Sequence, residues 1–278
     1  MFEGRKVLIA TKHKKELVIA PILEKELCIS SYVSEQFDTD ILGTFSGEIE
    51  RKDDALTTLR NKCILAANAS NSDLVIASEG SFGAHPSIFF AHANQELVML
   101  KDFKNDLEII AKEISLETNF NGQKISNKLD LLTFAEKVNF PSHALILKSD
   151  EVNYLTIFKG IQCEEELLEK FHELQKKNGF AYVETDMRAI NNPTRMKVIE
   201  KATWQLIEKI KSICPSCQTP GFDIVDAVLG LPCELCKCPT RSTLYYMYQC
   251  KKCNYSSKKM FPRGITYEDP TYCDTCNP

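Results

Sequence analysis

Apolar and polar positions follow two different periods along residues 1–213 of the chain. Short apolar runs predict strands, and longer stretches with apolar residues three and four positions apart predict helices. The expected strands are Lys6–Ala10, Leu74–Ala77, Ala144–Leu147, Tyr154–Lys159 and Phe180–Glu184, together with a hairpin of Ile88–Phe90 and Glu96–Leu100 around Asn94-Gln95. The expected helices are Lys14–Leu27, Asp53–Ala69, Asn127–Val138, Glu164–Lys177 and Pro193–Ile213.

Alternation of strands and helices predicts an α/β domain with a mixed or mostly parallel sheet and flanking helices over residues 1–213. Residues 214–278 differ, because cysteines dominate them and apolar residues are too few for a separate core. We therefore expect two domains, the second a small zinc-ribbon-like module whose folding free energy comes largely from metal.

Composition and charge narrow the cellular setting. The chain has 278 residues, 44% hydrophobic and 26% charged, and a net charge of −4 gives no overall attraction for nucleic acid. The only apolar run near the N-terminus, Val7–Ala10, is too short for a signal peptide, and no apolar stretch approaches the length of a membrane span. These features predict a cytoplasmic protein without membrane contact.

Four Cys-x-x-Cys pairs follow one another in the C-terminal module: Cys214/Cys217, Cys233/Cys236, Cys250/Cys253 and Cys273/Cys276. Each pair can chelate one ion from a tight turn, and two pairs complete a tetrahedron, so the eight thiols predict two structural zinc sites. Disulfides would need an oxidising compartment, and four copies in one short region argue against a redox role.

The spacing leaves open which pairs share a zinc ion. Sequential sites would combine the first two pairs and then the last two. A nested arrangement would combine Cys233/Cys236 with Cys250/Cys253 and close the module with the outer pairs. The alternating segment Thr243–Gln249, which predicts a strand running into Cys250, fits both arrangements.

The first candidate ligand site is Thr11-Lys12-His13-Lys14-Lys15, directly after the first expected strand. Ligands of α/β folds gather at the carboxyl ends of strands, beside helix N-termini. Thr11 can cap the following helix, and Lys12, Lys14 and Lys15 can meet an anion. The alternative is a solvated basic helix start.

The second candidate is the segment with the sequence ASEGSFG, residues 77–83. Gly80 and Gly83, which flank Ser81, allow positive φ or a close approach of the backbone to a ligand. Glu79 would then be a metal ligand or a base. The alternative is a turn with a solvated glutamate.

The third candidate runs from Glu184 to Met196. Strand alternation would place Glu184, Asp186 and Arg188 on one face, where two carboxylates can hold Mg²⁺. Arg195 falls in the first turn of the last helix, where a cation opposes the helix dipole. We therefore expect it to pair with an anion or with these carboxylates. The alternative is an internal salt-bridge network with a purely structural role.

Two resemblances to known families bear on the same segments. The run from Lys6 to Gly83 resembles the pyrophosphatases of inosine and xanthosine triphosphates, which have a strand, a Thr/Ser–Lys phosphate loop, a helix with an acidic start such as 48–54, and a strand ending in Glu-Gly, here Glu79-Gly80. The usual asparagine of the first loop is missing. The whole chain also resembles a bacterial family of unknown function, through ASEGSFG, ETDMRA with NPTRM, CPSC, GLPC and the terminal CNP.

Together the candidates predict a Mg²⁺-dependent hydrolase, a phosphohydrolase or pyrophosphatase acting on a nucleotide or another phosphorylated small molecule. The catalytic residues would be Glu79, Glu184, Asp186, Arg188 and Arg195, and the ligand-binding residues Thr11, Lys12, Lys14, Lys15, Gly80, Ser81 and Gly83.

The alternative function is that of a zinc-ribbon protein without catalytic activity, which binds nucleic acid or another protein. Residues 239–267 contain no acidic side chain and interleave lysines and arginines with tyrosines. This composition suits phosphate contact and base stacking. Six acidic side chains and the thiolates offset the seven basic ones of the module, so it can offer at most one basic face.

Overall fold

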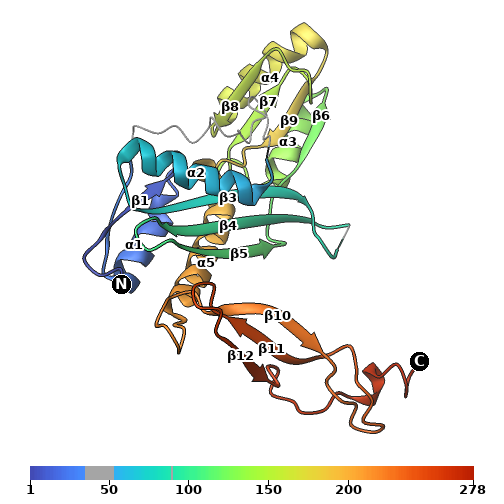
Figure 1. Cartoon of the computed structure of the whole chain (residues 1–278). Coiled ribbons are helices and arrows are strands. Elements are labelled where there is room, and N and C mark those ends of the chain that lie inside the picture. Colours follow the sequence, from blue (N-terminus) through green and yellow to red (C-terminus); the bar gives the residue numbers. More distant parts are fainter. Residues whose placement is uncertain (35–52, 89) are drawn as a thin grey trace. The chain divides into compact units, whose positions relative to one another are not determined.

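The computed structural model describes residues 1–34, 53–88 and 90–278. The chain divides into two compact units, Met1–Leu206 and Ile207–Pro278 (Figure 1). The division falls inside the last helix, α5 (Pro193–Lys211), rather than directly before Cys214. Sheets with flanking helices make the fold mixed α/β, as the sequence predicts. None of the helices in the described residues combines the length and apolar character that crossing a bilayer requires.

The first sheet of the larger unit is mixed, with the order β2-β1-β3-β4-β5 (Figure 1). Its strands are β1 (Lys6–Ala10), β2 (Ser30–Tyr32), β3 (Leu74–Ala84), β4 (His92–Asp102) and β5 (Leu107–Ser115). The strand β1 runs parallel to β2 and β3, whereas β3, β4 and β5 are successive antiparallel strands. Of the two expected forms, mixed and mostly parallel, this sheet therefore adopts the mixed one.

Helices cover both faces of this sheet. On one face, α2 (Ala55–Ser70) packs its Leu59, Cys63 and Ala66 against apolar side chains of β1, β3 and β4. Asp54 caps α2 by accepting hydrogen bonds from the backbone N–H groups of two first-turn residues. On the other face lies α5, which contacts β4 and β5 through side chains, and Lys15, the residue directly before α1 (Glu16–Leu27), contacts Ser78 of β3 there.

Two local predictions for this sheet are wrong. The expected hairpin turn at Asn94-Gln95 lies inside β4, because β3 and β4 pair from Leu74–Asp102 to Ala84–His92 and the chain turns between them. Residue 89 of that turn is not described. The segment 77–83 is not a loop after the strand but part of β3. Its glycines suggest a break, yet cross-strand pairing with β4 prevails over local propensity.

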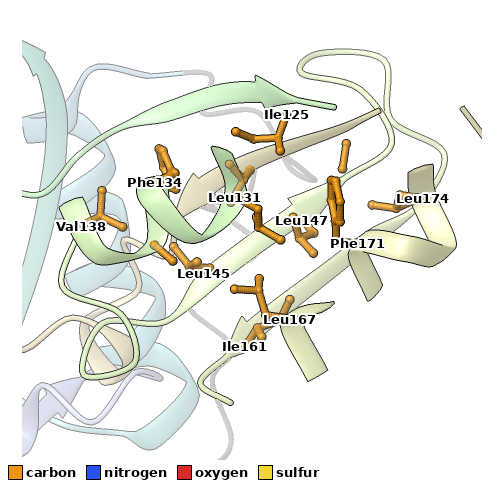
Figure 2. Packing of buried hydrophobic residues seen from close by; sticks show 13 residues of the cluster. Ile125, Leu131, Phe134, Val138, Leu145, Leu147, Ile161, Leu167, Phe171 and Leu174 are labelled. Atoms are coloured by element: carbon orange, nitrogen blue, oxygen red, sulfur yellow. The ribbon is translucent and has the colours of Figure 1, made fainter. Parts of the chain in front are cut away.

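The second sheet is antiparallel, with the order β6-β9-β7-β8. Its strands are β6 (Gly122–Ile125), β7 (Leu145–Lys148), β8 (Ile157–Ile161) and β9 (Ala181–Thr185). Figure 2 shows how α3 (Lys128–Lys137) and α4 (Glu164–Asn178) fill one face of this sheet with leucine and phenylalanine side chains. Each such side chain contributes about 1.5–3 kcal/mol when fully buried, so this half has a hydrophobic core of its own.

The smaller unit is built on three antiparallel strands, β10 (Asp223–Leu229), β11 (Thr243–Gln249) and β12 (Ser256–Met260), with β11 in the centre. No residue of the three strands is fully buried. A small hydrophobic cluster of this unit combines Phe222 with Cys214 and Cys250, and Tyr248 packs against it. Cysteines therefore occupy the place that apolar side chains take in the larger unit.

Candidate functional site

The eight cysteines of the four pairs form two groups of four, with ligand atoms within 4.8 Å of one another. In the first group, Cys214 and Cys253 have their Sγ atoms 3.7 Å apart, and Cys217 and Cys250 have theirs 3.6 Å apart. In the second group, the Sγ distances are 3.8 Å for Cys233–Cys276 and 3.5 Å for Cys236–Cys273. Four sulfurs at about 2.3 Å from one zinc ion lie about 3.8 Å apart, so each group could hold a zinc ion.

The pairing is neither of the two expected arrangements. The first pair joins the third, and the second joins the fourth, because the sheet sets their positions. Asp223 at the start of β10 pairs with Gln249 at the end of β11, which brings Cys214/Cys217 beside Cys250/Cys253. At the opposite ends of β10 and β11, the chain leads to Cys233/Cys236. There Cys233 forms a β-bridge with Glu268, which lies shortly before the fourth pair. The spacing of the cysteines along the sequence does not specify this strand register.

The local backbone of the cysteine pairs suits metal binding. Gln218, Lys237 and Asn254, each directly after the second cysteine of a pair, adopt left-handed backbone conformations with φ of 59°, 62° and 59°. This tight turn lets both thiols of a pair face one point. The hydroxyl of Thr219 lies 3.2 Å from the sulfur of Cys217 and lowers the pKa of that thiol to about 6, which favours the thiolate that zinc requires.

A separate buried polar cluster lies where β1 ends in the first sheet. β1 stops at Ala10, opposite Ala77, whereas β3 continues to Ala84. Just past that point, the carbonyl of Ser78 lies 3.4 Å from Nζ of Lys15 and 3.3 Å from Nζ of Lys62. Lys15 also donates to the Ser78 hydroxyl at 3.0 Å. The two ammonium groups come from α2 and from the residue before α1, and both are at least nine-tenths buried.

Two ion pairs complete this cationic cluster, which we define as Lys15, Lys62, Ser78, Glu79, Glu96 and Arg195. Glu79 accepts from Lys62 at 2.6 Å, so its carboxylate already has a cation. Glu96 and Arg195, whose side chains are both fully buried, pair at 2.7 Å, and Arg195 also donates to the carbonyl of Met187. Arg195 thus pairs with a carboxylate, as expected, but this carboxylate is Glu96 on β4 rather than Glu184 or Asp186.

Gly80 makes room for the Glu96–Arg195 pair. A Cβ at Gly80 would lie 2.5 Å from Nη2 of Arg195 and 2.5 Å from Oε1 of Glu96. The groups that approach Gly80 closely are therefore side chains of the same chain. A Cβ at Gly83 would meet nothing within 4 Å, and Ser81 is half-buried between the two glycines.

Thr11 and Lys15 are the buried members of the first candidate segment, whereas Lys12 and Lys14 are exposed. Thr11 does not cap α1, whose N-cap is Lys15. The Thr11 hydroxyl is buried and has no hydrogen-bond partner within the described part of the chain, and the same is true of Oδ1 of Asn94 on β4. Burial, with Arg195 and Lys62 nearby, lowers the pKa of Lys15 to about 7.

The third candidate segment is divided between two ion pairs. β9 ends at Thr185, so Glu184 lies in the strand and pairs with Lys148 at 2.8 Å. Burial raises the pKa of Glu184. Asp186, fully buried, accepts from Arg188 at 2.5 Å and from Asn191 at 2.8 Å. Among the described residues, no three carboxylates share one metal-sized group, so Glu79, Glu184 and Asp186 do not converge.

Sequence reasoning does not single out Lys62, Ser78 or Glu96. A signal for two of them exists, because Glu96 directly precedes the apolar run Leu97–Leu100 and Lys62 directly precedes Cys63, which lies on the apolar face of α2. A charged side chain in such a position needs a partner, and its presence predicts a second buried charge. The partner itself depends on the fold.

Comparison with known proteins places the chain in a family. Residues 62–278, more than half of the chain, match the family described as a domain of unknown function (DUF6671), and the chain belongs to that family. The match spans β3, α5 and all four cysteine pairs. A search of the curated proteins finds no match. The resemblance of Lys6–Gly83 to inosine and xanthosine triphosphate pyrophosphatases is not confirmed, and residues 48–52 of its acidic segment lie outside the described residues.

Proposed function

We propose that the larger unit binds a phosphorylated small molecule, with nucleotides as the first class to test, at the cationic cluster. The observation that carries the proposal is the convergence of two buried lysines, Lys15 and Lys62, on one backbone carbonyl, that of Ser78. Proteins rarely bury two ammonium groups side by side, because each disfavours the charge of the other. An anion between them would remove that cost.

The charge balance of the cluster supports the same proposal. Among the described residues, three cationic side chains, Lys15, Lys62 and Arg195, lie beside two carboxylates, Glu79 and Glu96. The lowered pKa of Lys15 is a consequence of this excess and of burial. A phosphate group would restore the charge of Lys15 and would offer acceptor oxygens to its ammonium group.

The position of the cluster in the fold supports ligand binding as well. It lies past the carboxyl end of β1 and at the start of α1, where ligands of α/β sheets commonly bind. The buried Thr11 hydroxyl, which has no partner in the described residues, belongs to the same strand-to-helix connection. We propose that it donates to the ligand, with the exposed Lys12 and Lys14 of that connection assisting.

We further propose hydrolysis of a phosphoanhydride as the reaction class. Magnesium is usually held by one or two carboxylates together with substrate phosphates, so a protein need not supply a complete cage. Glu79 is the carboxylate of the cluster that could exchange its lysine partner for such an ion. Glu184, Asp186 and Arg188 would act indirectly, since Met187, between Asp186 and Arg188, accepts a hydrogen bond from Arg195 through its carbonyl.

Isothermal titration of the full chain with nucleoside triphosphates and pyrophosphate, with and without Mg²⁺, tests the binding proposal. Lys15→Met should weaken binding at least about tenfold, equivalent to 1.4 kcal/mol. The matched control is Lys25→Met, an exposed lysine in the last turn of α1, which should leave binding within about twofold. Absence of binding across the panel, or equal loss in both variants, would contradict the proposal.

Release of phosphate or of pyrophosphate in the presence of Mg²⁺ tests the hydrolytic step separately. If Glu79 acts through a metal, Glu79→Gln should abolish turnover while binding of the metal-free nucleotide persists. Binding without turnover of any triphosphate would restrict the unit to a binding function.

A further inference from the structure

The three-stranded sheet of the smaller unit has side chains at least partly open to solvent on every strand. All seven residues of β11 are half-buried, and most residues of β10 and β12 are exposed. The cysteine groups lie at the two ends of the sheet rather than on its faces. The faces are therefore open to a partner.

Basic side chains of this unit are not distributed evenly. Arg241 pairs with Asp274, Arg263 pairs with Glu268, and Lys237 lies over the ring of Tyr267, all near the second cysteine group. In contrast, four lysines beside the first group or on β12 make no ion pair with described residues, namely Lys251, Lys252, Lys258 and Lys259. Their charge exceeds the net charge of about −2 of a zinc ion with four thiolates.

The two faces of the sheet differ in charge and in aromatic content. On one face, Tyr246 and Tyr248 of β11 stand opposite Lys259 and Ser257 of β12, and the β10 residues paired with them are Ala227 and Ile224. No acidic side chain belongs to these paired positions. On the other face, Asp226 stands opposite Met247, and Lys258 already lies 4.6 Å from the ring centre of Tyr245.

Aromatic rings continue from the first of these faces toward the first cysteine group. Tyr248 packs against Phe222 with ring centres 5.6 Å apart, and Phe222 packs against the exposed Tyr255 at 5.9 Å. Tyr246 and Tyr248, two residues apart on one strand, are separated by about 7 Å, roughly twice the 3.4 Å rise of stacked bases. Unstacked bases of a flexible single strand can match this separation, whereas the bases of a duplex expose no free ring face.

We propose that the face of Tyr246, Tyr248 and Lys259, together with Lys251 and Lys252, binds single-stranded nucleic acid. The tyrosine rings stack on bases, and the lysines contact phosphates. Stacking tolerates any base, because every base has a π face, so the binding is sequence-tolerant and depends strongly on salt. The surface belongs to the smaller unit, and its binding of nucleic acid does not rest on ligand binding by the larger one.

Fluorescence anisotropy of the zinc-loaded full chain with labelled 12-nucleotide oligouridylate and oligothymidylate tests the proposal. Binding is expected at 20–50 mM salt, should weaken as salt rises, and should exceed binding of a 12-base-pair duplex. Lys251→Glu with Lys252→Glu should weaken it more than about tenfold, and Tyr246→Ala about fivefold or more. Tyr246→Phe, which keeps the ring, should restore binding.

The control is Lys237→Glu, the same substitution at one lysine of the second cysteine group, with half the charge change of the double variant; this lysine already lies over Tyr267. It should leave binding within about twofold, and zinc content should be the same in every variant. The proposal is overturned if no oligonucleotide binds at 20 mM salt, if the duplex binds equally well, or if Lys237→Glu weakens binding as much as the double variant. Equal competition by polyglutamate would identify an acidic-peptide surface and would overturn it too.

Discussion

In the larger unit, helices bury the apolar faces of two sheets, and charged side chains are buried only in pairs or clusters. In the smaller unit, no strand residue is fully buried, and two cysteines and one phenylalanine form a small hydrophobic cluster. The comparison shows two ways to fix polar groups in place. The larger unit has apolar cores that can hold charges close together, whereas we propose that the smaller unit depends on metal held by its cysteine groups to define its fold.

This difference also separates the two kinds of chemistry. A stable core can keep Lys15 and Lys62 beside one carbonyl, although their mutual repulsion is unfavourable. The smaller unit leaves its lysines at the surface, where solvent stabilises them. We therefore propose a small enclosed anion as the ligand of the buried charges, and an extended polyanion as the ligand of the exposed charges beside aromatic rings.

The largest effect should come from the zinc ligands, since a structural zinc site contributes about 10–16 kcal/mol. Elemental analysis should find two zinc ions per chain. Cys214→Ser combined with Cys250→Ser alters one site and should leave one zinc, whereas Cys214→Ser combined with Cys233→Ser alters both and should leave almost none. Cys238→Ser, which changes a cysteine outside both groups, should keep two. Equal zinc loss in the two double variants would contradict the observed pairing.

Breaking the Glu96–Arg195 pair should have the next largest effect, in the larger unit alone. Glu96→Gln removes the carboxylate from a fully buried arginine and should lower the free energy of unfolding by about 3–5 kcal/mol. Urea unfolding followed by fluorescence of Trp204, the only tryptophan, measures this change.

Arg60→Met is the comparison for that experiment, because the Arg60–Glu108 pair lies at the surface. It should cost about 0–1 kcal/mol. If Glu96→Gln costs no more than this, the buried pair does not stabilise the larger unit.

Adding one methyl group at Gly80 should have a smaller effect on the same pair. The new Cβ would displace the Glu96 and Arg195 side chains, so Gly80→Ala should cost about 1–3 kcal/mol. Gly83→Ala adds the same atom to the same strand in open space and should change stability by less than about 0.5 kcal/mol. Similar losses in both variants would indicate an effect of strand propensity rather than of the ion pair.

The smallest effect concerns the pH dependence of Lys15. Its pKa is lowered from 10.5 to about 7 in the folded chain, so the unfolded state binds more protons between these values. The free energy of unfolding should therefore rise with pH above about 7, by at most about 1.4 kcal/mol per pH unit. Lys15→Met should remove this rise in urea unfolding at pH 7, 8 and 9, and Lys25→Met should keep it. An unchanged slope in Lys15→Met would contradict the low pKa of the buried lysine.

Periodicity predicts the elements with strong apolar faces. The helices α2, α3, α4 and α5 and the strands β1, β7 and β11 lie within a few residues of their expected positions. β12 is not predictable in this way, because its sequence Ser-Ser-Lys-Lys-Met has no apolar face and pairing with β11 alone makes it a strand. Periodicity does not predict β5 either, since its apolar residues are consecutive rather than strictly alternating.

The cysteine groups and the cationic cluster also differ in how far the sequence predicts them. The cysteine pairs carry their chemistry in local spacing, so two groups of four could be predicted, whereas their pairing depends on strand register. The cationic cluster joins residues that lie far apart in the sequence, such as Glu96 and Arg195. Local patterns mark Glu79 and Arg195 as unusual but cannot supply their partners.

We expect the fold of the smaller unit to depend on metal and the fold of the larger unit to be independent of it. Hydrogen exchange of the full chain, monitored by mass spectrometry before and after removal of zinc with a strong chelator, tests it directly. We predict that amides of β10, β11 and β12 lose protection, whereas those of β3, β4, α2 and β7 keep it. Loss of protection in both units, or persistence of protection in the smaller one without zinc, would contradict the claim.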